Sequence, residues 1–452
     1  MMIGLQIKQL IRSKGLVMGL FLLFAIGVLS IHIGKVFLDR QVKVIELTQE
    51  VQKEHLDRHV DYIDGHIGLL LYYVKFGFAN DQSSLSGLSI GQKDFRQAAQ
   101  LINIRNLEEQ KNSSEFLNPL FQLLGNLDLS FVLIYLFPLI IIALCFDMLS
   151  VEKESGRWSL LSVQSKNPRK IISSKLLIRF CFIFIVLALL LGISVFYLKL
   201  PLDASLLSFT GIALLYICFW FSLSWWIISL NKSSKQNAIM LLSSWLITTT
   251  VLPAITNSVV SSLYPMPEAY KTIIDSRDGY HTKWDQPKEP TIKKFKQHYP
   301  QFEQYNHPEG ESFGWFWYYA MQQMGDDESL EARQAMKAKL HDRQKLTQTI
   351  GYSVPSIHAQ LSFNQLSKSG MTNYLNYLDA LEGYHEKLRL NFYPKVFEAN
   401  PIKSENWNNY RMEYLSDVSK INIMIFLPLI LANLLFLMLA ANSFKKNIVS
   451  IR

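Results

Sequence analysis

Two histidines at helical spacing, His55 and His59, are the residues of this sequence whose type and spacing most directly offer chemistry. Positions i and i+4 lie on one face of an α-helix, so two such imidazoles can share one metal ion. Asp64 and His66 lie a few residues further on. The alternative is that these are solvated side chains of a long polar helix. We favour that alternative and expect no metal to be bound.

The sequence lacks several motifs that carry well-known chemistry. It has no G-x-x-x-x-G-K-[ST] phosphate-binding loop, no H-E-x-x-H pair and no Cys/His cluster with zinc-site spacing. The three cysteines, Cys145, Cys181 and Cys218, lie in apolar stretches and are expected to pack as small apolar residues. We therefore expect no catalytic residues, and no cofactor bound directly by this chain.

The chain that must position these residues is strongly apolar. Of its 452 residues, 49% are hydrophobic and 18% are charged. Six runs are long and apolar enough to cross a bilayer, which needs about 20 residues. They are Leu16–Phe37, Leu129–Leu149, Leu176–Leu198, Leu206–Leu230, Ala238–Val260 and Ile421–Ala441. The sequence predicts an all-α polytopic membrane protein with six transmembrane helices and two mainly helical insertions.

Basic residues indicate how the predicted spans are oriented. Lys8, Arg12 and Lys14 precede the first run, and cytoplasmic flanks carry the excess of Lys and Arg in membrane proteins. Alternation then puts residues 150–175, residues 231–237 and the C-terminal tail inside. These segments are basic, whereas the rest of the chain is slightly acidic. Both termini are therefore expected in the cytoplasm, and the net charge of +8 needs no nucleic-acid partner.

The predicted topology divides the chain into nine parts. In order, these are a cytoplasmic interfacial helix (1–14), the first transmembrane helix (15–37), a first extracytoplasmic domain (38–128), the second transmembrane helix (129–149), a cytoplasmic helical segment (150–175), the third to fifth transmembrane helices (176–260), a second extracytoplasmic domain (261–420), the sixth transmembrane helix (421–441) and a cytoplasmic tail (442–452).

Both insertions are expected to be mainly helical. The first begins with a polar stalk that continues the first span from Asp39 to about Ile63. The second begins with a Pro-rich stretch that reads as irregular, followed by helical tracts at Glu328–Thr349 and Ile357–Val396. These tracts can pair as a hairpin and pack on the stalk, because neither insertion alone has the residues of a rich core.

Polar and proline residues within the spans limit what the bundle can do. Ionisable groups are almost absent at mid-membrane, which disfavours an ion-coupled carrier and an intramembrane protease. A mid-span proline frees a backbone carbonyl and allows a kink. The residues expected either to line a pathway or to pack helix on helix are Pro138, Ser244, Thr248, Asn422, Pro428 and Asn433.

The charged stretch between the second and third runs is the best-defined feature of the cytoplasmic side. It reads Glu152-Lys-Glu-Ser-Gly-Arg-Trp-Ser-Leu-Leu161. Ser150 can cap a helix, and acidic residues favour the positive end of its dipole, so we expect an amphipathic helix from Val151 to Val163. Such a helix offers a surface on which another protein can push. The residues expected to make that contact are Glu152, Glu154, Gly156, Arg157, Trp158, Leu160 and Leu161.

This stretch resembles the coupling region of ABC-2 type transporter permeases. Family members carry a Glu-rich start, a Gly, a Leu-Leu pair, a basic turn and Gly-Lys-Leu-Leu entering the next span. Here Ser174-Lys-Leu-Leu177 has Ser in place of that Gly, and Arg157 stands where the family has Thr. The two large insertions are similar to those of bacterial permeases associated with multicopper-enzyme maturation, as are Leu85–Asp94 and Gly125–Leu129.

The resemblance implies a multi-pass permease subunit of the bacterial inner membrane that takes part in export. ATP and Mg²⁺ would be bound by a separate ATPase dimer seated on residues 150–165, and a second permease, identical or paralogous, would complete the transporter. Membrane lipid and an envelope protein are further expected partners. Two alternatives stay open. One is a non-transporting mechanotransducer of the ABC type that acts on an envelope partner. The other is a membrane-anchored metal- or ligand-binding module that uses His55 and His59.

Overall fold

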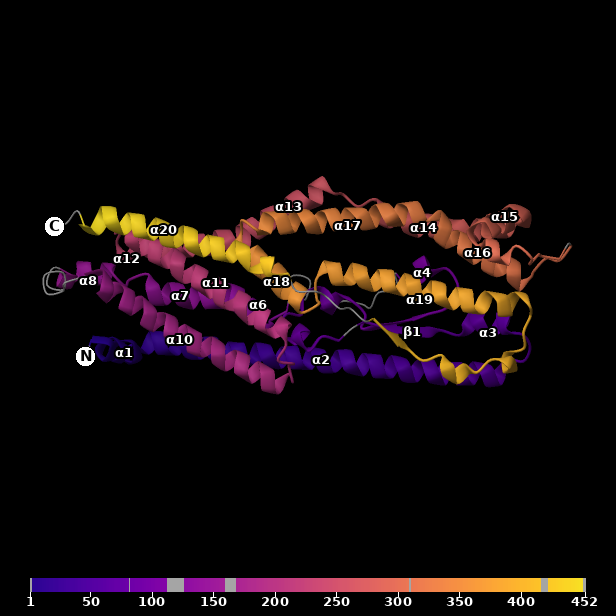
Figure 1. The fold of residues 1–452 in the computed structure, drawn as a ribbon, viewed down its shortest axis with the longest axis horizontal. Helices are drawn as coiled ribbons and strands as arrows, with labels where there is room; N and C mark the ends of the chain where they lie inside the picture. Colours follow the sequence, from indigo (N-terminus) through magenta and orange to yellow (C-terminus); the bar gives the residue numbers. More distant parts are fainter. Residues whose placement is uncertain are drawn as a thin grey trace.

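The computed structural model describes residues 2–80, 82–111, 126–158, 168–308, 310–415 and 422–449. These residues form a long, mainly helical molecule (Figure 1). The N-terminus, helix α8 and the C-terminus lie at one end, which we call the terminal end (Figure 1). Helices α3, α15 and α16 lie toward the opposite end (Figure 1).

Six helices among the described residues are long and apolar enough to cross a membrane. They are Lys14–Tyr62, Leu129–Glu154, Ile171–Tyr197, Ala204–Ser229, Ser234–Leu263 and Ile423–Lys446. Their apolar parts lie side by side in the half of the molecule that contains the terminal end (Figure 1), and together we call them the membrane bundle. The chain therefore has the architecture of a multi-pass helical membrane protein, as the sequence predicts.

The elements of the membrane bundle include three irregular turns. In chain order the elements are α1 (Met2–Arg12), α2 (Lys14–Tyr62), α6 (Leu129–Phe131), the π-helical turn η3 (Val132–Leu136), α7 (Phe137–Cys145), α8 (Ser150–Glu154), α10 (Pro168–Tyr197), α11 (Ala204–Ser229), α12 (Ser234–Leu246), the π-helical turn η4 (Ile247–Val251), α13 (Leu252–Leu263), the 3₁₀ turn η9 (Ile423–Phe426) and α20 (Leu427–Val449). Helix α11 is the most buried of the spans, whereas α12, α13 and α20 keep wide apolar faces exposed.

Helix α2 joins the bundle to the rest of the molecule. It has 49 residues, which corresponds to about 74 Å at 1.5 Å per residue. The predicted stalk is thus a direct continuation of the first span. Near its middle, Gly34 lets the backbone approach the 3₁₀ turn η1 (Ser84–Gly87), because a Cβ atom on Gly34 would lie 1.8 Å from Gly87 O.

The remaining elements form what we call the distal region, which comprises the end of α2 and the described residues of 63–111 and 264–415. Its further α-helices and strands are α3 (Ile67–Tyr73), β1 (Phe76–Ala79), β2 (Ala99–Ile102), α4 (Leu107–Lys111), α14 (Glu268–His281), α15 (Lys288–His298), α16 (Trp315–Glu328), α17 (Leu330–Gly351), α18 (Pro355–Leu366), α19 (Met371–Phe397) and β3 (Glu413–Tyr414). Helices α17 and α19 run along the long axis of the molecule (Figure 1).

The distal region contains a small β-sheet, so the prediction of an all-α chain is incomplete. Its strand order is β2-β1-β3. Strand β1 pairs antiparallel with β2, with Phe76 opposite Ile102, and parallel with β3, with Phe78 opposite Glu413. Strands of two to four residues are too short to show an alternating pattern, and β3 comes from the second insertion, so the sequence gives little sign of this sheet.

Two details of the second insertion also differ from the sequence prediction. The stretch read as irregular contains α14 and α15, because Pro267 and Pro287 stand at the N-caps, just before the helical residues, and so interrupt neither helix. The tract Ile357–Val396 is divided into α18 and α19. The break lies at Lys368, with φ of +53°, just before Gly370, the N-cap of α19.

One hydrophobic cluster connects the two insertions. It contains Leu70 and Ile102 from the first insertion and Trp317, Tyr319 and Phe392 from the second, each less than 2% exposed. Large buried aromatic and aliphatic side chains contribute the most to a core. The two insertions therefore share a core, and the distal region is built from both.

Candidate functional site

The charged stretch that begins at Glu152, which we call the charged segment, lies at the terminal end. It begins as the last turn of the second span. Helix α8 continues the second candidate span and is followed by a turn at Ser155 and Gly156. Gly156 has φ of +71°, a left-handed conformation that glycine adopts without strain. The continuous helix expected from Val151 to Val163 is therefore interrupted at this turn. Leu160 and Leu161 themselves lie outside the described residues.

Glu152 connects the charged segment to the third span. One carboxylate oxygen lies 2.7 Å from Nζ of Lys175, which belongs to α10, and the other lies 3.1 Å from Nε of Arg157. The Glu152 and Lys175 side chains are 12% and 15% exposed, whereas that of Arg157 is 53% exposed. Because solvent screens an exposed pair more strongly, the contact with Lys175 is the stronger of the two.

Glu154 connects the same segment to the fifth span. Its two carboxylate oxygens accept hydrogen bonds from Ser234 N at 2.9 Å and from Ser234 Oγ at 3.0 Å. Ser234 is the first residue of α12, where a carboxylate is favoured by the helix dipole. Ser150, expected to cap α8, instead lies 2.8 Å from the Ser234 hydroxyl. Lys153 also donates to Asn231, in the loop before α12.

These contacts give the segment a role within its own chain. Glu152 and Glu154, expected to contact a partner, also hold the segment to two spans of this chain. Trp158 is half-buried against the bundle core, with Lys153 Nζ 5.6 Å from its ring centroid. The accessible part is the turn at Gly156, where an added Cβ would meet nothing within 4 Å, together with the exposed Arg157.

A cavity of about 460 Å³ lies beside the segment, between it and α1. The Glu152–Lys175 ion pair lines it, and so do Asp147 and Arg179, whose closest charged atoms are 3.9 Å apart. Gln6 lines the side formed by α1. The interfacial helix predicted over residues 1–14 therefore lies next to the charged segment.

At the other end of the bundle, three prolines follow the irregular turns. The first is Pro138, just after η3. In η3 the N–H of Phe137 bonds to Val132 O, five residues back, and the next residue, Pro138, has no N–H to donate. The hydroxyl of Tyr216, on α11, donates to Ile134 O in the same turn at 3.1 Å. The contact joins the second and fourth spans at the point where the helix is irregular.

The fifth span shows the same arrangement at Pro253. In η4 the N–H of Leu252 bonds to Ile247 O, five residues back. In that register the next donor would be Pro253, which has no N–H to offer to Thr248 O. The hydroxyl of Ser356, on α18, donates to Thr248 O instead.

In the sixth span, too, a side chain of another helix donates to a carbonyl beside a proline. This proline is Pro428, which lies near the start of α20 and not at mid-span. In η9 the N–H of Leu427 bonds to Met424 O, three residues back, so Pro428 would be the next donor, to Ile425 O. His358 Nε2, also from α18, donates to Ile425 O at 2.7 Å. Helix α18 therefore holds the proline turns of two spans to the distal region.

The other residues expected in a pathway or in helix packing are separate from one another. Asn433 is 8% exposed. It accepts a hydrogen bond from Ser222 Oγ at 2.9 Å and donates one to Leu215 O at 3.0 Å, so its contacts pack one helix on another. Ser244 donates to a carbonyl of its own helix. Asn422 accepts a backbone N–H of η9. Asn422 and Pro428 line one cleft, whereas Ser244 and Asn433 do not line it.

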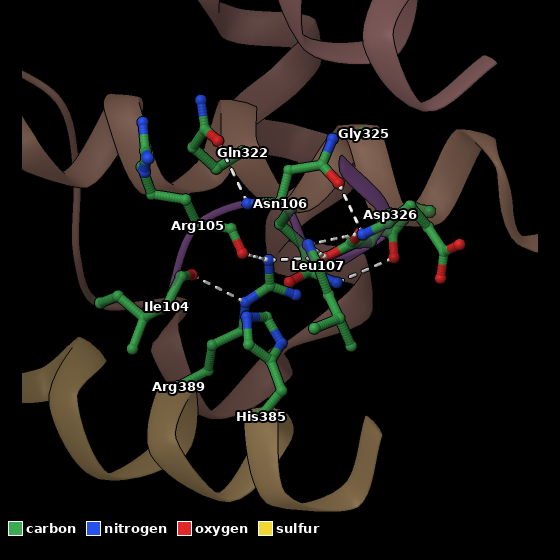
Figure 2. Close-up of polar contacts among 12 residues, drawn as sticks. Ile104, Arg105, Asn106, Leu107, Gln322, Gly325, Asp326, His385 and Arg389 are labelled. Atoms are coloured by element: carbon green, nitrogen blue, oxygen red, sulfur yellow. Dashed lines mark hydrogen bonds and ion pairs between the residues drawn. The ribbon is translucent and has the colours of Figure 1, made fainter. Parts of the chain in front are cut away.

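A buried polar cluster joins the two insertions in the distal region (Figure 2). Asp326 of α16 accepts backbone hydrogen bonds from Leu107 at 2.9 Å and from Glu108 at 3.1 Å. It also pairs with Arg389 of α19 at 2.7 Å. Arg389 is 2% exposed and donates to Ile104 O at 3.1 Å. One ion pair thus connects residues 104–108 with two helices of the second insertion.

Close packing surrounds this cluster. The side-chain amide of Asn106 donates to Ser276 O at 3.2 Å, and its backbone N–H donates to Gln322 at 3.2 Å. Asn106 also packs against Gly325 (Figure 2), where a Cβ atom would lie 2.2 Å from Asn106 Nδ2. Only glycine fits at that position without displacing its neighbours.

Two titratable side chains beside the ion pair, Glu108 and His385, have shifted pKa values. Burial raises the pKa of Glu108, but the charges and hydrogen bonds of Lys111 and Arg333 lower it more, so the result lies below the usual value. Burial, with a smaller effect from Arg389, lowers the pKa of His385 well below 6.5. A permanently ionised carboxylate and a neutral imidazole are typical of a structural clamp. We therefore assign this cluster to stability.

The predicted pair of histidines lies on the distal part of α2. The His55 and His59 rings stack with centroids 4.0 Å apart, and His59 Nδ1 lies 2.7 Å from His55 O. The part of the chain that the structure describes contains no group of three His, Cys, Asp or Glu side chains placed to hold a metal ion. The geometry therefore offers no support for the metal-binding alternative.

The first insertion contains a short motif that resembles one found in serine hydrolases. Gly87-Leu-Ser89-Ile-Gly91 matches the G-x-S-x-G pattern of serine hydrolases. In those enzymes the serine is exposed at a sharp turn from a strand to a helix. Here Ser89 follows η1, is fully buried and donates to Asn364 Oδ1 at 2.8 Å. The motif is a packing contact in this structure.

The comparisons with known proteins concern the distal region. A family model described as "Domain of unknown function (DUF3526)" matches residues 269–412, which begin at the second residue of α14 and include α15 to α19. No curated protein and no solved structure matches the chain. The matched residues form less than half of the chain and exclude the charged segment at the terminal end.

Proposed function

We propose that this chain is the permease subunit of an ATP-driven transporter of the ABC-2 type, an exporter in the inner membrane of a bacterium. A separate ATPase dimer hydrolyses ATP, and a second permease completes the assembly. In this arrangement the terminal end faces the cytoplasm and the distal region faces the envelope. The resemblance of residues 152–177 to the coupling region of such permeases supports the proposal.

The observation that carries this proposal is the double attachment of the charged segment. Glu152 is paired with the third span through Lys175, and Glu154 is bonded to the first turn of the fifth span at Ser234. A partner that pushes on the accessible turn at Gly156 therefore moves two spans together. A loose loop between spans would not transmit such a movement.

Co-expression with the ATPase encoded nearest to this chain tests the proposal. The measurement is ATP hydrolysis by the complex in nanodiscs. Glu152→Gln keeps the shape of the side chain but removes the charge that faces Lys175. We therefore expect ATP hydrolysis to become uncoupled from the movement of the spans, while the complex still forms. Glu413→Gln, in an exposed ion pair of the distal region, is the matched control and should leave hydrolysis unchanged. Equal hydrolysis in both variants would contradict the role of Glu152.

Gly156→Pro tests the turn itself. Proline fixes φ near −65°, whereas Gly156 has φ of +71°, so the turn must reorganise. We expect the ATPase to be lost on purification. Gly310→Pro is a matched control, because Gly310 has φ of +83°, also has no atom near its Cβ position, and belongs to the distal region. Loss of the ATPase from both variants would point to general misfolding.

A second candidate function is a mechanotransducer that moves an envelope partner without transporting a substrate. The contacts of α18 favour it, because Ser356 and His358 tie the distal region to the proline turns of two spans. Spin labels in the distal region should then change their separation on ATP addition in the absence of any substrate. Ser356→Ala should reduce that change. ATP-dependent accumulation of a substrate in sealed vesicles would favour the transporter instead.

A further inference from the structure

A large cleft lies where the bundle meets the distal region. Its volume is about 970 Å³, at the upper end of the roughly 300–1,000 Å³ of small-molecule sites. Residues of α17, α18 and α20 line it, together with the turn before α20. It is distinct from the cavity beside the charged segment, which lies at the terminal end and is lined by other residues.

One wall of the cleft is the apolar face of α20. Leu427, Leu431 and Leu435 line it and are 42%, 55% and 54% exposed. These residues belong to a candidate span, so their exposed side faces the hydrocarbon region of a bilayer. The cleft is therefore continuous with the surface that membrane lipid covers, and a hydrocarbon chain can enter it from the side.

The opposite wall is polar. Gln348 and Tyr352 from the end of α17, and Ser362 and Gln365 from α18, line it. Gln348 and Gln365 also line a smaller adjoining cavity of about 40 Å³, which includes Asn373. Its further polar lining residues are Gln92, Gln344, Asn364 and Thr372. Amides and hydroxyls both donate and accept hydrogen bonds, as the hydroxyl groups of a sugar or polyol require.

Within the described ranges the polar wall has no charged side chain, and this limits the kind of head group that it can bind. Among the described residues, no Asp, Glu, Lys or Arg lines the cleft or the adjoining cavity. Sites that bind phosphate or carboxylate usually supply Arg or Lys. His358 lines the cleft, but its Nε2 donates to Ile425 O. The wall therefore suits an uncharged head group and disfavours an anionic one.

We infer that this cleft binds an amphiphile with a neutral, hydroxyl-rich head group, such as a glycosylated lipid. Its hydrocarbon chain lies along α20, and its head group is hydrogen-bonded by Gln348 and Gln365. The inference does not depend on the ATPase, because binding at this cleft needs neither the charged segment nor ATP. Within the proposed transporter, the cleft lies against the proline turn of the sixth span, which α18 holds through His358, so an occupant would touch the joint between the bundle and the distal region.

Photo-crosslinking of the full chain tests this inference. The protein is placed in phosphatidylcholine nanodiscs that contain a glucosyl-diacylglycerol with a diazirine close to the head group. In parallel nanodiscs, phosphatidylglycerol carries the same photoreactive group. Labelling is read by peptide mass spectrometry at Leu361 of α18, which lines both cavities and lies away from the lipid face of α20. The glucosyl probe should label Leu361, and unlabelled glucosyl-diacylglycerol should compete with it.

Two variants and one control sharpen the test. Gln365→Leu removes a head-group hydrogen bond and should lower labelling about fivefold. Leu431→Trp should block it by filling the apolar wall. Leu434→Trp is the matched control, because Leu434 is similarly exposed on α20 at 46% but does not line the cleft, so labelling should persist. If Leu431→Trp does not fold, Gln365→Leu carries the test alone.

Three results would overturn the inference. Equal labelling by the phosphatidylglycerol probe would mean that the wall does not select a neutral head group. Unchanged labelling in Gln365→Leu would mean that the polar wall does not hold the ligand. Disulfide formation between two copies of Leu431→Cys, with loss of labelling, would mean that a second protein chain occupies the cleft.

Discussion

Replacing Asp326 by Asn removes the charge that faces the buried guanidinium of Arg389. Asn keeps the size of the side chain, but its NH₂ group is a donor, and it would face the donors of Leu107, Glu108 and Arg389. Arg389 is 2% exposed and cannot lose its proton, so it becomes an uncompensated buried charge. The distal region should therefore lose stability at the point where its two insertions meet.

The size of this loss follows from the burial of the pair. The side chains of Arg389 and Asp326 are 3% and 7% exposed. Breaking a buried ion pair costs about 3–5 kcal/mol. For a region of this size, each kcal/mol lowers the melting temperature by about 2–4 °C, so we expect a decrease of about 6–20 °C. Glu413→Gln, which breaks an exposed pair with Lys387, should cost no more than about 1 kcal/mol.

The assay is thermal unfolding of the full chain in nanodiscs, followed by tryptophan fluorescence, with hydrogen exchange of the peptide that contains Leu107 and Glu108. Hydrogen exchange at these two amides should accelerate in Asp326→Asn, because the aspartate accepts a hydrogen bond from each of them. The double variant Asp326→Leu/Arg389→Met removes both charges and should be more stable than Asp326→Asn. A shift no larger than that of Glu413→Gln would refute the reasoning.

Three further predictions concern other contacts. Gly34→Ala puts a Cβ 1.8 Å from Gly87 O and should cost about 1–3 kcal/mol in thermal unfolding. Because the folded-state pKa of His385 lies well below 6.5, unfolded chains take up the proton first. Stability should therefore fall as the pH drops below about 6.5, and His385→Asn should flatten that fall in melting curves. Ser356→Ala removes the donor to Thr248 O and should increase hydrogen exchange in η4, with a loss of about 1 kcal/mol.

The features that could be predicted from the sequence are those carried by long local patterns. An apolar run of about 20 residues must cross a membrane or be buried, and the six spans follow from that alone. The helical period of the polar stretch after the first run likewise predicts the continuation of α2 to Tyr62. The charged stretch after the second run is visible as an interruption of that apolar pattern.

The features that could not be predicted depend on contacts between distant residues. Glu154 and Ser234 are far apart in the sequence, and neither type alone indicates the contact. The left-handed conformation of Gly156 cannot be predicted from the sequence, because glycine is compatible both with a helix and with the turn that ends one. The role of α18 depends on Ser356 and His358 reaching carbonyls of two spans, which no local pattern indicates.

Site-specific crosslinking from Arg157 to the ATPase tests the central proposal most directly. Arg157 is 53% exposed beside the turn at Gly156, so a photoreactive amino acid placed there should reach a protein seated on the segment. We predict an adduct between this position and the ATPase in the intact complex, and none from Lys387, which is 67% exposed in the distal region. An intact complex that crosslinks at Lys387 but not at Arg157 would contradict the account.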